Sequence, residues 1–282
     1  MKSTLITAEE LAAMSPDGVL IVDCRFDLAD ADKGERDYRA EHIPGAMFAH
    51  LDRDLSDLGR VKLGLGRHPL PTEEAFSALL SRLGWRPGLQ VVSYDANNGS
   101  LAAARLWWLL RLCGVREAAV LNGGHAAWKA ANLPVSREIP QRQPTQVSVH
   151  YESSQVVIDH AAIGSRRDEL LIDARATPRY RGEVEPIDRV AGHVPGAANR
   201  PFTDNLQADG RFKSPAELRE AFRAVIGDHA PEQVVHMCGS GVTACHNLLA
   251  MEHAGLTGSR LYAPSWSGWI SDTSRPVATG NG

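Results

Sequence analysis

The chain has 282 residues, of which 43% are hydrophobic and 23% are charged. This ordinary globular balance excludes a disordered chain, a collagen-like fibre and a coiled coil. The net charge of −4 calls for neither a nucleic-acid partner nor a membrane partner. No apolar run reaches the length of a transmembrane helix, and at roughly 100–200 residues per domain the length suggests two domains.

Cysteine usage and the N-terminal residues both bear on location. The four cysteines, Cys24, Cys113, Cys238 and Cys245, are too few for a disulfide scaffold and form no CxxC pair. The first ten residues contain no signal-peptide hydrophobic core. We therefore expect a reducing, cytoplasmic location. No metal-ligand spacing, Walker loop or dinucleotide fingerprint occurs, so we expect neither a metal nor a cofactor.

Short apolar strands alternate with amphipathic helices along the chain. Buried strands are predicted at 19–23, 90–94 and 118–121, and a helix is predicted over 72–83. Ser214 to Glu217 form a capping box that opens another helix. This alternation predicts an α/β fold class, with a mainly parallel sheet and helices on both of its faces. Ligands of such folds bind at the carboxyl ends of strands.

Four sequence elements recur in the same order in the second half of the chain. The matching stretches are 22–25 with 172–175, the HIPGA turn at 42–46 with HVPGA at 193–197, 91–94 with 234–237, and Leu121 and Trp128 with Leu261 and Trp269. A period this long indicates a duplicated domain rather than a solenoid. We predict domains at 1–138 and 150–282, joined by a polar, proline-punctuated linker at 139–149.

Cys238 is the predicted nucleophile. It follows the strand at 234–237 and precedes a small-residue loop and a helix. Gly239 and Gly241 let the loop curl so that several N–H groups can point inward. Inward N–H groups and the positive end of a helix both favour an anion, and here the anion is a thiolate. The competing hypothesis is a buried cysteine beside a glycine turn.

A cysteine-dependent phosphatase would also hold its thiolate in a loop before a helix. That enzyme needs an arginine just past the loop to bind the phosphate with both arms of its guanidinium. Ala244 occupies this place, and the loop contains neither arginine nor lysine. The sequence therefore disfavours a phosphatase.

These features resemble the rhodanese superfamily in its tandem two-domain sulfurtransferase form. The loop at 238–244 matches the CGSGVTA pattern of the 3-mercaptopyruvate sulfurtransferase branch, and the HIPGA turn, its HVPGA copy and the segment 265–269 also fit. In the first half, Asp95 stands at the position that matches Cys238. A carboxylate cannot carry transferable sulfur, so this half is expected to be catalytically silent.

The resemblance implies a ping-pong reaction through a persulfide on Cys238. A small-molecule sulfur donor gives its sulfur to the thiolate, and a thiol, cyanide or a thioredoxin-like reductant then removes it. The loop residues Gly239, Gly241, Val242 and Thr243 would bind the substrate anion. We expect no nucleic-acid and no membrane partner.

The donor is expected to be 3-mercaptopyruvate. Gly239 and Ser240 leave the loop neutral, which suits a monoanion better than the thiosulfate dianion. The resemblance further implies a proton relay made of Asp52, His68 and Ser240, since all three positions match the family's relay. We expect Asp52 and His68 to reach an active site in the second domain, close to the domain interface.

Arginines should bind the donor carboxylate, because a guanidinium can donate hydrogen bonds to both of its oxygens. Arg179 matches the family's substrate arginine. Arg189 is the one further arginine offered by the following segment, which is shorter than the family pattern. Thiosulfate therefore stays open as an alternative donor. A non-catalytic persulfide carrier that delivers sulfur to a partner protein is the alternative of another class.

Overall fold

The computed structural model describes residues 1–96, 98–165 and 168–281. Its contacts divide the chain into two compact units. The first unit comprises Met1–Asp57, Leu70–Glu152 and Asp209–Arg211, and the second comprises Leu58–Pro69, Ser153–Ala208 and Phe212–Gly282. The segment Leu58–Pro69 therefore packs with the second unit although it precedes most of the first in the chain. The predicted linker at 139–149 contains neither helix nor strand, and the domain limits stay a prediction.

The first unit is built on a five-stranded parallel sheet. Its strand order is β1 (Leu5–Ile6), β5 (Ala118–Leu121), β4 (Gln90–Tyr94), β2 (Val19–Asp23) and β3 (Met47–Phe48). The helices are α1 (Ala8–Ala12), α2 (Lys33–Ala40), α3 (Leu51–Asp54), α4 (Glu73–Arg82), α5 (Ala102–Leu112) and α6 (Gly124–Ala130). The three predicted strands of this half and the helix at 72–83 are thus present.

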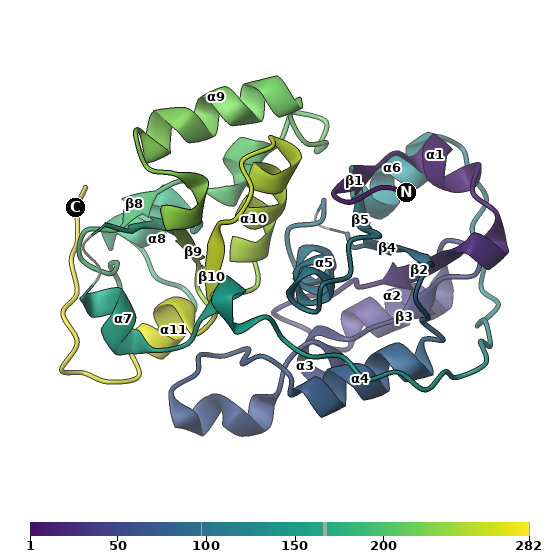
Figure 1. Cartoon of the computed structure of the whole chain (residues 1–282), viewed down its shortest axis with the longest axis horizontal. Helices are drawn as coiled ribbons and strands as arrows, with labels where there is room; N and C mark the ends of the chain where they lie inside the picture. The colour runs from purple at the N-terminus through teal and green to yellow at the C-terminus, as the bar shows by residue number, and fades with distance from the viewer. Residues whose placement is uncertain (97, 166–167, 282) are drawn as a thin grey trace. The chain divides into compact units, whose positions relative to one another are not determined.

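The second unit repeats this plan strand for strand. Its order is β6 (Val156–Val157), β10 (Arg260–Tyr262), β9 (Val234–Met237), β7 (Leu170–Asp173) and β8 (Ala198–Asn199), again all parallel. The helices are α7 (His160–Gly164), α8 (Thr177–Arg181), α9 (Pro215–Ile226), α10 (Ala244–His253) and α11 (Ser265–Trp269) (Figure 1). The predicted duplication and α/β fold class are confirmed.

The side chains of β9 point alternately to the two faces of the second sheet, and helices cover both faces. Val235 and Met237 point into a core that contains Trp266 and Trp269 of α11. His236 points to the opposite face, where its Nε2 lies 3.1 Å from the sulfur of Met251 on α10. A central strand buried on both faces is typical of a doubly covered parallel sheet.

The duplication extends to buried ion pairs at the ends of matching strands. Arg25 donates to Asp23 with its Nη2 at 2.6 Å, and Arg175 donates to Asp173 in the same geometry at 2.6 Å. Each arginine also donates to the backbone carbonyl before the His-Ile/Val-Pro-Gly turn, at Glu41 in the first unit and at the equivalent residue in the second. The repeated sequence thus folds into repeated contacts, which hold the loops at the carboxyl edge of each sheet.

Local signals account for the helix that the capping box predicts. The Ser214 hydroxyl accepts from the N–H of Glu217, and the Glu217 carboxylate accepts from the N–H of Ser214. Pro215 occupies the first helical position, where no intrahelical N–H bond is lost. Leu218, Phe222 and Ile226 are the buried residues of α9. The helix starts where the sequence predicts.

Candidate active site

Cys238 lies directly after β9, in the loop that leads into α10. Its side chain is buried, with 1% of its surface exposed. Its N–H donates to the Ser265 hydroxyl at 3.1 Å, and its carbonyl accepts from the N–H of Trp266 at 3.0 Å. The start of α11 therefore fixes the backbone that carries the thiol.

Gly241 makes the tight curl of the loop possible. Its φ is +74°, in the left-handed region, and a Cβ at this position would lie 2.3 Å from the carbonyl oxygen of Ala263. A side chain would have to push the backbone of the neighbouring β10–α11 connection. Glycine is therefore required here for both conformation and space.

Loop N–H groups remain available to an anion beside the thiol. Among the hydrogen bonds of the described residues, none is donated by the backbone N–H of Gly239, Ser240 or Val242. Thr243 is the N-cap residue of α10, so the positive end of that helix also faces the loop. A negative charge on Cys238 or on an outer sulfur would be stabilised by such donors.

The corresponding loop of the first unit already contains an anion. Asp95, fully buried, accepts hydrogen bonds from the N–H groups of Gly99 at 2.8 Å and of Leu101 and Ala103 at 3.2 Å. The repeated loop is thus built to surround a negative charge, and in this half a fixed carboxylate occupies the place. This geometry supports the prediction that the first half is catalytically silent.

His68 and Ser240 are in contact within the second unit. His68 Nδ1 lies 2.8 Å from Ser240 Oγ, and each residue is only 6% exposed. His68 reaches the loop because Leu58–Pro69 packs with the second unit. Two of the three predicted relay residues are therefore brought together. Their role in proton transfer stays a prediction.

Asp52 belongs to α3 of the first unit. Its N–H donates to Nδ1 of His50 at 3.1 Å, an arrangement that caps the start of this short helix. The predicted membership of Asp52 in the relay stays a prediction.

Arg179, on α8, is held by two buried carboxylates. Its Nη2 donates to Glu185 at 2.7 Å and to Asp188 at 3.2 Å, and its Nε also donates to Glu185. Burial raises the pKa of Glu185, but hydrogen bonds from Arg179 and from backbone N–H groups outweigh it and lower this pKa below its usual value. Glu185 is therefore ionised, and none of the described bonds of Arg179 uses Nη1.

Arg67 is a site residue that the sequence analysis missed. It forms an ion pair with Asp188. A Cβ on Gly239 would lie 3.0 Å from Nη2 of Arg67 and 3.8 Å from Nη2 of Arg179. Two guanidinium groups therefore face the residue next to Cys238. No local pattern indicates this, because Asp188 is 121 residues away from Arg67.

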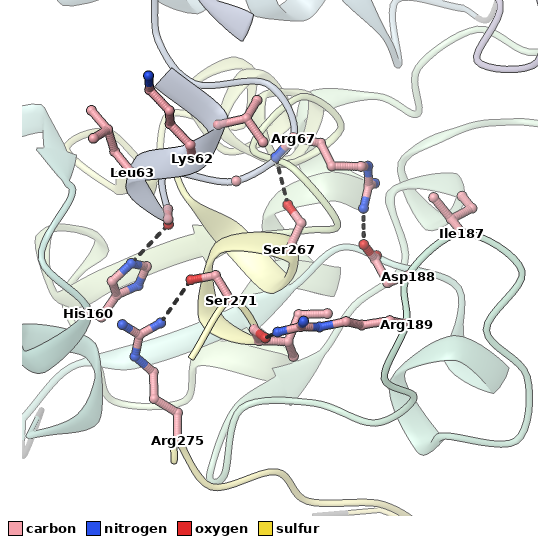
Figure 2. Close-up of a pocket in the computed structure, with 14 residues that line it drawn as sticks. Lys62, Leu63, Arg67, His160, Ile187, Asp188, Arg189, Ser267, Ser271 and Arg275 are labelled. Carbon is pink, nitrogen blue, oxygen red and sulfur yellow. Dashed lines mark hydrogen bonds and ion pairs between the residues drawn. The ribbon is translucent and has the colours of Figure 1, made fainter. Parts of the chain in front are cut away.

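Arg189 contacts the backbone at the end of α11. Its Nη2 donates to the backbone carbonyl of Ile270, and the side chain lines a pocket that Arg67 and Asp188 also line (Figure 2). The three atoms nearest to a Cβ on Gly239 belong to Arg67, Arg179 and Asp188. Binding of the donor by Arg189 stays a prediction.

Cys24 and Cys113 lie in surroundings that disfavour a thiolate. All four cysteines are free. Burial, reinforced by Asp23, raises the pKa of Cys24 well above its usual value. Burial also raises the pKa of Cys113 to about 12. Both of these thiols are therefore protonated at neutral pH and unsuited to nucleophilic attack.

Comparisons with known proteins identify the family. The model of the rhodanese-like domain matches residues 7–131 and 159–272. The chain belongs to this family. Both halves are matched, as the duplicated sheets require.

This rhodanese-family chain has whole-length relatives with sulfurtransferase names. It is 48% identical to a probable 3-mercaptopyruvate sulfurtransferase of Pseudomonas aeruginosa, covering 98% of both chains. It is 38% identical to a putative thiosulfate sulfurtransferase of Mycobacterium tuberculosis, covering 98% of this chain and 97% of the relative. The solved structure of 3-mercaptopyruvate sulfurtransferase from Leishmania major is 32% identical, with a TM-score of 0.82 over 94% of this chain and 73% of that one.

The predicted family resemblance and sulfurtransferase class of this rhodanese-family chain are therefore confirmed. Among the described residues, none of the helices is long and apolar enough to cross a membrane. Within the same residues, no group of three or more His, Cys, Asp and Glu side chains could hold a metal ion.

Proposed function

We propose that this protein transfers sulfur from 3-mercaptopyruvate, through a persulfide on Cys238, to a thiol or cyanide. The observation that carries the choice of donor is the 2.8 Å contact between His68 and Ser240, directly beside the nucleophile. A relative 48% identical over the whole chain bears the name of this activity. Transfer from thiosulfate would not need this contact, because its leaving group, sulfite, departs without a proton.

In the first half-reaction the Cys238 thiolate attacks the sulfur of 3-mercaptopyruvate. A sulfur–sulfur bond forms, the carbon–sulfur bond breaks, and its electron pair passes to the carbon as pyruvate enolate. The outer sulfur loses its proton and the carbon gains one, so a group that moves protons lowers the barrier. Ser240 would give its hydroxyl proton to the carbon, and His68 would restore it to the serine oxygen.

In the second half-reaction an acceptor nucleophile attacks the outer sulfur of the persulfide. The sulfur–sulfur bond breaks, and its electron pair returns to Cys238 as a thiolate. The loop N–H groups near Gly239 and Ser240 stabilise the negative charge in both the thiolate and the persulfide states. The enzyme thus alternates between two anionic forms in one loop.

The donor carboxylate is proposed to bind between Arg179 and Arg67. Both guanidinium groups lie on the side of Gly239 to which a Cβ would point, and Arg67 is so close that a side chain there would displace it. Asp188 bridges both arginines. An incoming carboxylate would compete with Asp188 for these donors, and the arginine fork would orient it.

Thiosulfate is the second candidate donor. The same pair of guanidinium groups could bind a dianion, although the Cys238 loop itself is neutral. The relative from M. tuberculosis is named for this donor. The non-catalytic persulfide carrier, the thioredoxin-like acceptor and the cytoplasmic location stay predictions.

One experiment tests the proposal. The kcat/KM values for 3-mercaptopyruvate and thiosulfate are compared under the same conditions with cyanide as acceptor. Higher kcat/KM for 3-mercaptopyruvate supports the proposed donor, and higher kcat/KM for thiosulfate reverses the assignment. Absence of multiple turnovers with either donor, while Cys238 still accepts one sulfur, would indicate a carrier.

A further inference from the structure

A cationic pocket lies in the second unit, adjacent to the Cys238 loop but separate from it. Its volume is about 660 Å³, and residues within 61–67, 187–189 and 267–275 line it. Arg189 and Arg275 both extend toward the segment that carries Ser271, as Figure 2 shows. A volume in this range accommodates a ligand of drug size, which is larger than 3-mercaptopyruvate.

Positive charge dominates the lining. Lys62, Arg67, Arg189 and Arg275 contribute cations, and Asp188 is the one acid among the described lining residues. Asp188 is already paired with Arg67. Positive charge therefore remains on Lys62 and Arg189, and in part on Arg275, which has Asp272 at 3.8 Å, and it would attract an anionic ligand.

Arg189 and Arg275 are held mainly by neutral groups. Arg189 donates to the carbonyl of Ile270, and Nη1 of Arg275 donates at 2.9 Å to the carbonyls of Gly268 and Trp269. These bonds restrict the side chains without cancelling their charge, although Asp272 lies 3.8 Å from Arg275. Ordered cations bind a carboxylate at a smaller entropic cost than freely rotating ones.

One residue that lines the pocket is hydrogen-bonded to the Cys238 loop. Ser267, a lining residue, donates from its N–H to the carbonyl of Gly239 at 2.9 Å. Its hydroxyl accepts from the N–H of Arg67 at 3.0 Å. Since Gly239 follows Cys238, this hydrogen bond joins the lining of the pocket to the loop that would carry the persulfide.

We propose that this pocket binds the carboxylates of the sulfur acceptor, so that the preferred small acceptor is an anionic thiol of peptide size. The inference rests on the proposed persulfide function and adds the class of acceptor. The pocket shares Arg67 and Asp188 with the proposed donor site, and the two substrates of a ping-pong reaction bind in turn. The acceptor thiolate attacks the outer sulfur, the sulfur–sulfur bond breaks, and the electron pair returns to Cys238.

The test compares two acceptors that share one thiol. Glutathione carries a carboxylate at each end, and glutathione diethyl ester carries none. We expect Arg189→Gln and Lys62→Gln each to raise the acceptor KM for glutathione by about two- to five-fold, the range of a partly exposed ion pair. The KM for the ester should not change. Arg189→Lys, which keeps the charge, should recover most of the loss.

Arg223→Gln is the matched control, because Arg223 is an exposed cation on α9 outside the pocket. It should leave both acceptors unaffected. Equal KM changes for glutathione and its ester, or no change for either, would refute the acceptor pocket. The proposed function fails separately: it requires mass spectrometry to show one added sulfur on Cys238 after 3-mercaptopyruvate treatment, before any acceptor is added.

Discussion

Removal of the Ser240 hydroxyl tests the relay most directly. His68 Nδ1 contacts this hydroxyl at 2.8 Å in a site where both residues are only 6% exposed. General acid–base catalysis typically contributes about 10²–10⁴-fold, which corresponds to about 3–5 kcal/mol of the activation barrier. Ser240→Ala should therefore lower kcat for 3-mercaptopyruvate by about 10²-fold or more. Loss of one hydrogen bond should cost only about 1 kcal/mol of stability, so the protein remains folded.

The assay follows pyruvate release with 3-mercaptopyruvate and sulfite release with thiosulfate. Thiosulfate turnover should barely change in Ser240→Ala, since sulfite leaves without a proton. His68→Gln should reproduce the loss for 3-mercaptopyruvate. Because the two residues would act as one unit, the double variant should be no slower than the worse single variant. Equal losses on both donors, or losses that multiply in the double variant, would show that Ser240 only shapes the loop.

Three further predictions follow from the buried groups of the site and its sheet. Cys238→Ser should abolish turnover while Cys24→Ser retains it, and sulfur found on another cysteine after donor treatment would contradict the assignment. Arg179→Lys should raise the KM for 3-mercaptopyruvate by an amount equivalent to about 1.5–3 kcal/mol, because an ammonium cannot replace the fork; an unchanged KM would remove Arg179 from the donor site. Burial first, and then the charge of Arg200, lower the pKa of His236 to about 3. Below pH 6.5 the His236 side chain binds a proton in the unfolded chain, but in the folded chain it stays neutral down to about pH 3. The free energy of unfolding therefore decreases as the pH decreases from 6.5 to 3. His236→Leu should reduce that dependence by up to about 1.4 kcal/mol per pH unit in urea unfolding at pH 5 and 7.5; an unchanged dependence would show that His236 is not the cause.

The glycines of the loop explain why sequence reasoning succeeds near Cys238. A strand, a curled loop and a helix start are local features, so a short sequence window encodes them. Gly241, at φ +74°, must be glycine because Ala263 leaves no room for a side chain. Gly239 has an ordinary conformation, and its role appears only when Arg67 and Arg179 are seen to face it. The need for glycine at position 241 can be predicted from a backbone rule, but the need for glycine at position 239 cannot.

The sequence by itself determined the duplicated α/β fold, the match of Asp95 in the first half to Cys238 in the second, and the position of Cys238 at the end of a central strand. These features depend on periodicity and repeated motifs, which are properties of neighbouring residues. Only the tertiary structure decided that Leu58–Pro69 packs with the second unit and so brings His68 to Ser240. It also decided that Asp188 pairs with Arg67 and Arg179, and that Arg67, Asp188 and Arg189 line one pocket. These contacts join residues far apart in the chain, and their partners are selected by the packing of the whole unit, which no local pattern encodes.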